Sequence, residues 1–346
     1  MTSLQISLSS STIEQIFTFA FLSFLASMAL TPLYTSAAFS GKWWKRARTT
    51  TVTGEQAKVY QKLHAAKHQR NIPTMAGIIF VVATLLVTLA GNLSRNETWL
   101  PLAAMVGAGL IGLVDDIINI RGVGGGIAGM RAKVKSVLLL GVAFVGGWWF
   151  YNKLGVSSIH LPFFDNLHIG WLIVPLFMLV IFATANAVNI SDGLDGLAGG
   201  LTAIAFGAYA LIALIEHKYG ISGFCMTIVG ALLSYTWFNI FPARFFMGDV
   251  GSFALGTALG VVAMLTNTVL LLPIIGGVFV LEAGSVVVQL LSKRFRNGKK
   301  IFISSPIHHH FEAIGWPETK VTMRFWVLGE MAAFVGVIMF ILGGYQ

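Results

Sequence analysis

Two adjacent carboxylates, Asp115 and Asp116, follow directly on the apolar run 99–114. If that run forms a helix, both acids lie at its C-terminal end, where the helix dipole disfavours negative charge. Other acids also border apolar runs, namely Asp192, Asp195 and Asp249. Carboxylate oxygens are ligands that Mg²⁺ prefers, and enzymes commonly use bound Mg²⁺ to hold phosphorylated substrates. The acids therefore predict a divalent cation and phosphate chemistry.

The composition is that of an integral membrane protein. The chain has 346 residues, of which 56% are hydrophobic and 11% are charged, whereas soluble domains average about 25% charged residues. The net charge is +9, but the basic residues lie between apolar runs and form no basic face for nucleic acid. A single cysteine, Cys225, excludes a disulfide framework.

Ten apolar runs have about the length of 20 residues needed to cross a bilayer. They are 13–38, 76–92, 99–114, 136–152, 170–190, 197–215, 222–241, 251–266, 269–291 and 325–343. We expect an all-α integral membrane protein with about ten transmembrane helices, forming one transmembrane domain over residues 1–346. No internal repeat is evident, which argues against a transporter built from inverted repeats.

The distribution of Lys and Arg predicts the orientation of these helices. Alternate connections, beginning with the first, hold 20 of the 23 basic residues, and the other side holds only Arg95, Lys153 and Lys218. By the positive-inside rule, both termini face outward and five loops face the cytoplasm. The first twelve residues carry no Lys or Arg, so we expect no cleavable signal peptide. The unusual polar residues fall in the five inner loops, which we expect to form the active site.

The first two inner loops offer cations for a phosphate. Most basic residues of loop 40–75 fit an anchor to anionic lipid, but Lys67 and Thr74, close to the next helix, are candidates for phosphate binding. In the second loop, a glycine run follows Asp115 and Asp116 without the Walker pattern, and Lys133 after it would neutralise a diphosphate.

The third loop contains acids and amides but no Lys or Arg. Asn189, Asp192 and Asp195 are three residues apart, so a continuing helix would place them on roughly one face. Their acceptor atoms suit the hydroxyl groups of a sugar and the N–H groups of a base. In the fourth loop, Asn239 and Phe246 precede Asp249, which either caps the next helix or joins Asp115 and Asp116 around one metal ion.

The fifth loop carries His308, His309 and His310 in succession. Consecutive histidines point in different directions and no cysteine lies near them, so zinc is a poor fit and hydrogen bonding to phosphate oxygens is the better one. Within the preceding apolar run, Glu282 fits a hydrogen bond that locks helices together. Gln289, one turn from the inner surface, is placed to contact substrate.

Laid side by side, the loops resemble the phospho-N-acetylmuramoyl-pentapeptide transferases, a bacterial family among the polyprenyl-phosphate hexosamine-1-phosphate transferases. The motifs that mark the wider superfamily are the Asp115-Asp116 pair and the segment 186–196, which reads Asn-Ala-Val-Asn-Ile-Ser-Asp-Gly-Leu-Asp-Gly. The segment 306–312, Pro-Ile-His-His-His-Phe-Glu, followed by Gly-Trp-Pro-Glu at 315–318, is similar to the muramoyl branch. The resemblance extends from Pro73 to Trp326.

This resemblance implies an Mg²⁺-dependent enzyme of the bacterial cytoplasmic membrane. Its substrates would be UDP-N-acetylmuramoyl-pentapeptide and undecaprenyl phosphate, and its products lipid I and UMP; members of the family form homodimers. The resemblance assigns the metal to Asp249, the lipid phosphate to Asp115 and Asp116, and an essential catalytic role to His308. The residues that match the regions binding nucleotide, sugar and phosphate are Lys133, Asn189, Asp192, Asp195, Asn239, Phe246 and Gln289. Either an Asp deprotonates the lipid phosphate for direct attack, or an Asp forms a covalent phospho-enzyme.

The chain departs from the family in the first two loops. Asn119 stands where a lysine usually follows the Asp pair, and the family lysine of loop one matches Lys67 only with two extra residues. Two other functions stay open. A sister transferase would use UDP-N-acetylglucosamine, although the histidine segment argues against it. A transporter would need functional polar residues near the bilayer midplane.

Overall fold

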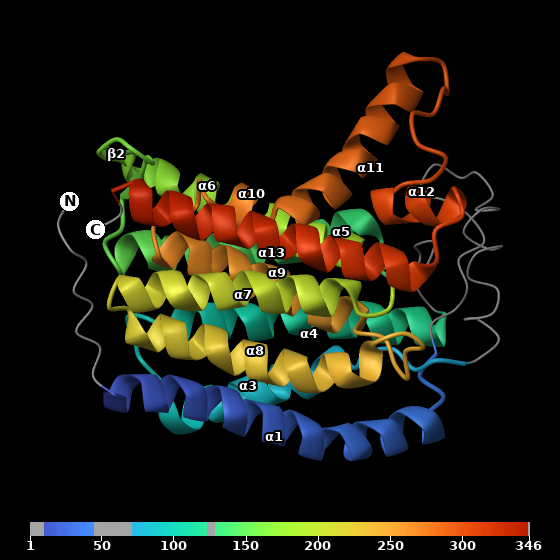
Figure 1. The fold of residues 1–346 in the computed structure, drawn as a ribbon, viewed down its shortest axis with the longest axis horizontal. Coiled ribbons are helices and arrows are strands. Elements are labelled where there is room, and N and C mark those ends of the chain that lie inside the picture. The colour runs from blue at the N-terminus through green and yellow to red at the C-terminus, as the bar shows by residue number, and fades with distance from the viewer. Residues whose placement is uncertain (1–9, 45–70, 123–128, 345–346) are drawn as a thin grey trace.

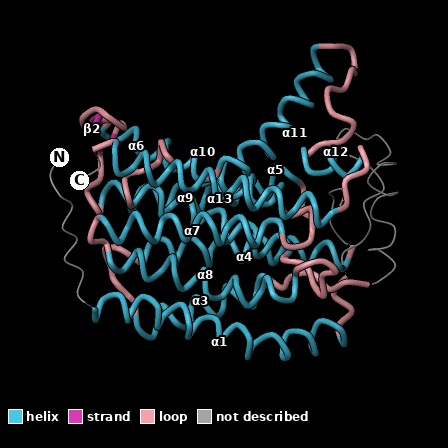
Figure 2. Tube along the Cα trace, viewed as in Figure 1, coloured by secondary structure: helices cyan, strands magenta, loops and turns pink. Residues whose placement is uncertain are grey.

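The computed structural model describes residues 10–44, 71–122 and 129–344, which form a bundle of long helices (Figure 1). Most of these helices run side by side along the length of the bundle (Figure 2). The first half contains α1 (Ser10–Ser40), α3 (Gly77–Gly91), α4 (Trp99–Arg121), α5 (Ala132–Asn152) and α6 (Ile173–Ser191). The second half contains α7 (Leu197–Ile215), α8 (Tyr219–Asn239), α9 (Gly248–Leu265), α10 (Leu272–Ile275), α11 (Gly277–Phe295), α12 (Ile307–Ala313) and α13 (Glu318–Leu342).

The expected class, an all-α integral membrane protein, is confirmed. Within the described ranges, eight helices are long and apolar enough to cross a membrane, namely α1, α4, α5, α6 with the preceding 3-10 turn η1 (Gly170–Leu172), α7, α8, α9 and α13. α3 is apolar but has 15 residues, and α11 contains Glu282, Lys293 and Arg294. The count of ten crossings and the orientation of the helices stay predictions.

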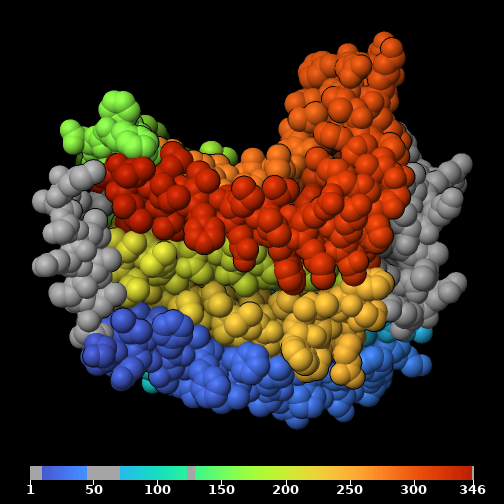
Figure 3. All heavy atoms as spheres, viewed as in Figure 1, coloured from blue at the N-terminus to red at the C-terminus, as the bar shows by residue number. Residues whose placement is uncertain are grey.

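The ninth apolar run is divided. Pro273 lies at the start of α10, Gly276 separates α10 from α11, and Gly277 is the first residue of α11. These residues are poor helix formers, so the single helix predicted over 269–291 breaks there. Beyond the break, α11 leaves the bundle at a steep angle, while the neighbouring helices stay parallel to its length (Figure 1). The spheres of α11 project clearly beyond the rest of the molecule (Figure 3).

The centre of the bundle is α9, in which every residue from Gly248 to Met264 is buried. It packs mainly against α4 and α6. The contact with α6 is close because Gly256 has no side chain: a Cβ there would meet the backbone of Thr184 and Ala185. Small residues of this kind let membrane helices approach closely.

Two short connections between the long helices have a defined structure. In the third inner loop, α6 ends at Ser191 and α7 begins at Leu197, so no continuing helix places Asn189, Asp192 and Asp195 on one face. Gly196 adopts a left-handed backbone with φ of 77°, which helices exclude, so both acids lie in a turn. Between α5 and α6 the chain forms a small antiparallel hairpin, β1 (Ser158–His160) with β2 (Asn166–His168), in which Ser158 pairs with His168.

The contact between α1 and α8 yields a stability prediction. A Cβ on Gly230 would overlap the carbonyl oxygen of Ala20, so Gly230→Ala must push the two backbones apart. We expect a loss of about 1–3 kcal/mol in the free energy of unfolding, measured by thermal unfolding in detergent. Gly207→Ala is the matched control, because a Cβ there meets nothing within 4 Å. Equal effects of the two substitutions would contradict the packing described here.

Candidate active site

The predicted site residues converge on one end of the bundle. Asp115 lies near the C-terminal end of α4, and Asn239 is the last residue of α8. Asp249 is the second residue of α9, and the three histidines are the second to fourth residues of α12. In Figure 1 these helix ends lie at the right, opposite the labelled chain termini. We call this the active end.

An ammonium group lies between two buried carboxylates at the active end. The Nζ atom of Lys135 is 2.9 Å from Oδ2 of Asp115 and 2.8 Å from Oδ2 of Asp249. The backbone N–H of Met130 donates to the other oxygen of Asp115 at 2.6 Å. Asp115 is 2% exposed and Asp249 is 5% exposed. One cation therefore serves two acids that are almost withdrawn from water.

The third carboxylate is attached to the first turn of α9. Oδ2 of Asp116 accepts a hydrogen bond of 3.1 Å from the backbone N–H of Val250. The positive end of a helix dipole stabilises negative charge there, which also favours Asp249 in the same turn. Among the described residues, three carboxylates thus gather near one ammonium group, and carboxylate oxygens are ligands that Mg²⁺ prefers.

Two glycines make this approach of α4 and α9 possible. A Cβ on Gly112, one turn before Asp115, would overlap the carbonyl of Asp249, so the two backbones can touch only without a side chain. Gly248 has a left-handed backbone with φ of 74°, and a Cβ there would meet Asp116. The absence of a side chain at Gly112 and Gly248 thus allows the acids of α4 and α9 to lie close together.

A lysine that the sequence analysis did not single out, Lys135, lies at the carboxylates, while the role of Lys133 at a phosphate stays a prediction. Lys133 has an exposed side chain, and Lys135 is the residue that contacts the carboxylates. The reason is that α5 begins at Ala132, four residues before the predicted run, and helix residues two apart point to different sides. Predicting from the sequence that Lys135 contacts the carboxylates would have required knowing that α5 begins at Ala132.

Within the described ranges, no three or more His, Cys, Asp or Glu side chains form a complete metal site. This suits Mg²⁺, which uses one or two carboxylates and takes its remaining oxygens from phosphate and water. Asp115 and Asp249 already face a common cation, Nζ of Lys135. The donor set therefore fits a magnesium ion that is held jointly by protein and substrate.

The turn between α6 and α7 is held by side chains that were predicted to bind substrate. Asp195 accepts a hydrogen bond of 2.9 Å from the N–H of Ala243. Asn239 accepts one of 3.0 Å from the N–H of Gly196 and donates one of 2.8 Å to the carbonyl of Phe245. Both residues are buried, so they fix the turn that presents the half-buried Asp192.

Other predicted residues also have partners within the protein. Asn189 donates to the hydroxyl of Ser252 at 2.8 Å. Gln289 accepts from the N–H groups of Ile301 and Phe302 and donates to the carbonyl of Phe302, so it holds segment 301–302.

The first inner loop meets the start of α9 through its backbone. The N–H of Phe246 donates to the carbonyl of Pro73 at 2.8 Å, which places the half-buried Phe246 beside the buried Thr74. Lys67 lies outside the described residues. These substrate contacts all stay predictions.

The three histidines point in different directions, as expected. His308 Nδ1 lies 2.8 Å from Oε2 of Glu282, and His309 Nδ1 lies 2.7 Å from Oε2 of Glu312. His310 Nδ1 accepts from the N–H of Ile303 at 3.2 Å. A Cβ on Gly193 would overlap Nε2 of His308, so that nitrogen faces the turn between α6 and α7.

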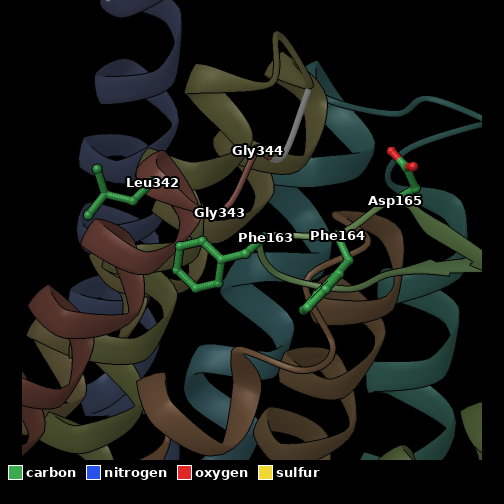
Figure 4. Close-up of a pocket in the computed structure, with 6 residues that line it drawn as sticks. All are labelled: Phe163, Phe164, Asp165, Leu342, Gly343 and Gly344. Atoms are coloured by element: carbon green, nitrogen blue, oxygen red, sulfur yellow. The ribbon is translucent and has the colours of Figure 1, made fainter.

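Two hollows elsewhere lack this chemistry. One, of about 560 Å³, lies at the opposite end of the bundle, and Asp165 is its only charged side chain (Figure 4). Its lining residues are Phe163, Phe164, Asp165, Leu342, Gly343 and Gly344. The other, of about 670 Å³, lies between α1 and segment 238–245 and includes Arg244. Neither is lined by the three carboxylates or by the histidines.

Comparison with known proteins gives consistent results. Residues 98–267 match the family model described as glycosyl transferase family 4. The chain is 40% identical over 337 residues to a phospho-N-acetylmuramoyl-pentapeptide-transferase of a Geobacillus species, an alignment that covers 94% of this chain and 98% of the relative. A protein of the same name from Chloroflexus aurantiacus is 37% identical over 92% of this chain and 91% of its own length. One from Bacillus thuringiensis is 38% identical over 91% and 94%, respectively.

The shared ammonium group yields a prediction for stability. Lys135→Met leaves Asp115 and Asp249 facing each other without their cation, and we expect a loss of about 3 kcal/mol in the free energy of unfolding. Thermal unfolding in detergent measures it. Lys133→Met, two residues away and exposed, should change stability by less than about 0.5 kcal/mol. A Lys135→Met protein as stable as the Lys133→Met control would show that the ion pairs do not form.

Proposed function

The chain belongs to the phospho-N-acetylmuramoyl-pentapeptide transferase family, and from that membership we propose its reaction. It transfers phospho-N-acetylmuramoyl-pentapeptide from UDP-N-acetylmuramoyl-pentapeptide to undecaprenyl phosphate. The products are lipid I and UMP, and the reaction serves peptidoglycan biosynthesis. The observation that carries this proposal beyond the family name is the meeting of Asp115, Lys135 and Asp249 at the active end.

We place the enzyme in the bacterial cytoplasmic membrane with the active end toward the cytoplasm. Support comes from the basic residues, 20 of 23 of which lie in the connections on one side of the predicted helices. The nucleotide sugar is soluble and the acceptor has a polyprenyl tail. A site at the end of a helix bundle is accessible to both the cytoplasm and the lipid.

The chemistry begins with two anions that repel each other. An oxygen of the lipid phosphate attacks the phosphorus that carries the sugar, and a new P–O bond forms. The bond from that phosphorus to the bridging oxygen breaks, and UMP leaves with that oxygen. Positive groups must neutralise the diphosphate before the acceptor approaches, and we assign Lys135 and a protonated His308 to this role.

We assign Mg²⁺ to Asp249, with Asp115 as the neighbouring carboxylate. When bound, the ion neutralises the diphosphate and stabilises the departing UMP. Asp116, attached to the first turn of α9 by Val250, fixes the position of Asp249 relative to α4. Asp115 takes the remaining proton from the lipid phosphate, which makes that oxygen the nucleophile.

The choice of sugar nucleotide tests the proposed function. Purified protein with undecaprenyl phosphate and Mg²⁺ should release UMP from UDP-N-acetylmuramoyl-pentapeptide and form lipid I. It should release none from UDP-N-acetylglucosamine, the substrate of the sister transferases. Asp249→Asn should lower turnover by at least about 10²-fold, because charge stabilisation at the diphosphate is lost. Turnover of UDP-N-acetylglucosamine alone would assign the chain to the sister reaction.

Direct attack makes a second prediction. Without undecaprenyl phosphate, the enzyme should not exchange radiolabelled UMP into UDP-N-acetylmuramoyl-pentapeptide, because no intermediate releases UMP before the acceptor attacks. A covalent phospho-enzyme would release UMP first and support exchange. Rapid exchange in the absence of lipid, lost in Asp115→Asn, would overturn the direct route and make Asp115 the nucleophile.

A further inference from the structure

A buried carboxylate on α11 contacts the histidine that is expected to be essential. Glu282 and His308 are both 0% exposed, and Oε2 of Glu282 lies 2.8 Å from Nδ1 of His308. A carboxylate inside an apolar helix costs about 2.5–3.5 kcal/mol on membrane-insertion scales. Such a residue needs a partner that offsets this cost, and His308 provides one.

The contact fixes the direction in which His308 faces. When the carboxylate is ionised it can only accept a hydrogen bond, and the proton between the two groups then belongs to Nδ1 of the imidazole. Nε2 then lies on the far side of the ring, against Gly193 in the turn that also carries Asp192. The backbone N–H groups of Ile307 and His308 also lie close to the Glu282 carboxylate and help to hold it.

We propose that Glu282 is a positioning residue that holds the proton on Nδ1 of His308 and directs Nε2 toward the substrate. Its negative charge stabilises the imidazolium form, which donates a hydrogen bond through Nε2 to the diphosphate. Carboxylates orient histidines in this way in hydrolase triads and beside metal ligands. The inference rests on the proposed function for what Nε2 contacts, but the Glu282 contact itself is independent of it.

The alternative is that Glu282 only locks α11 to α12. Its location makes this a real competitor, because α11 leaves the bundle (Figure 1) and the contact between Glu282 and His308 joins it to α12. A locking role requires a hydrogen bond but no negative charge. The positioning role requires the charge as well, so a substitution that keeps the hydrogen bond and removes the charge separates the two.

Glu282→Gln is that substitution, and its kinetics are the first readout. We expect thermal stability close to that of the unsubstituted protein, a decrease in kcat of about 10–100-fold and little change in KM for the sugar nucleotide. Glu282→Leu, which removes the hydrogen bond as well, should lower kcat further. Glu216→Gln is the matched control. Glu216 is also a shielded carboxylate, it lies 2.9 Å from Nζ of Lys218 beyond the end of α7, and its loss should leave kcat unchanged.

The second readout is the protonation of His308 itself. In full-length protein with ¹⁵N-labelled histidine, the ring signals of His308 are assigned by their loss in His308→Asn. We expect a protonated Nδ1 in the unsubstituted protein and in Glu216→Gln, and an unprotonated Nδ1 in Glu282→Leu. Unchanged His308 signals in Glu282→Leu, or full kcat in a folded Glu282→Gln, would overturn the proposal. An inactive unsubstituted protein with a protonated Nδ1 would count against the proposed function alone.

Discussion

The ammonium group of Lys135 lies between the buried carboxylates of Asp115 and Asp249, and the arrangement of the active end depends on this shared ion pair. Two acids this close repel each other when ionised, and burial strengthens the repulsion. Among the described contacts, the ammonium group of Lys135 offsets this repulsion, and Asp116 lies next to the pair, hydrogen-bonded to the first turn of α9. The proposed binding of a divalent cation with a diphosphate is built on this arrangement.

The packing of the bundle explains why the acids can meet at all. α9 is buried along nearly its whole length, so its first turn has a fixed position from which Asp249 and the N–H of Val250 reach α4. Gly112 lets the two backbones touch. On the other side, Asp195 and Asn239 hold the turn that His308 faces, and Glu282 holds His308. The positions of the residues expected to react therefore depend on Asp195, Asn239 and Glu282, which hold the turn and the histidine in place.

The sequence was sufficient for the helical membrane fold and for the residues that gather at one end, because long apolar runs and acids at their borders are strong signals. It did not supply the contacts that depend on where a helix begins. α5 begins at Ala132, and this start is what directs Lys135 toward the carboxylates. The partners of Asp195, Asn239 and Gln289 are backbone groups far along the chain or in the following loop, which no spacing rule reveals.

The central claim is that these carboxylates hold one divalent cation together with the substrate. Electron paramagnetic resonance of Mn²⁺, a substitute for Mg²⁺, measures this directly on purified protein with UDP-N-acetylmuramoyl-pentapeptide. We expect about one bound ion per chain, lost in Asp249→Asn and kept in Asp165→Asn, a change at an exposed carboxylate of the opposite end. Equal Mn²⁺ binding by Asp249→Asn and the unsubstituted protein would contradict the claim.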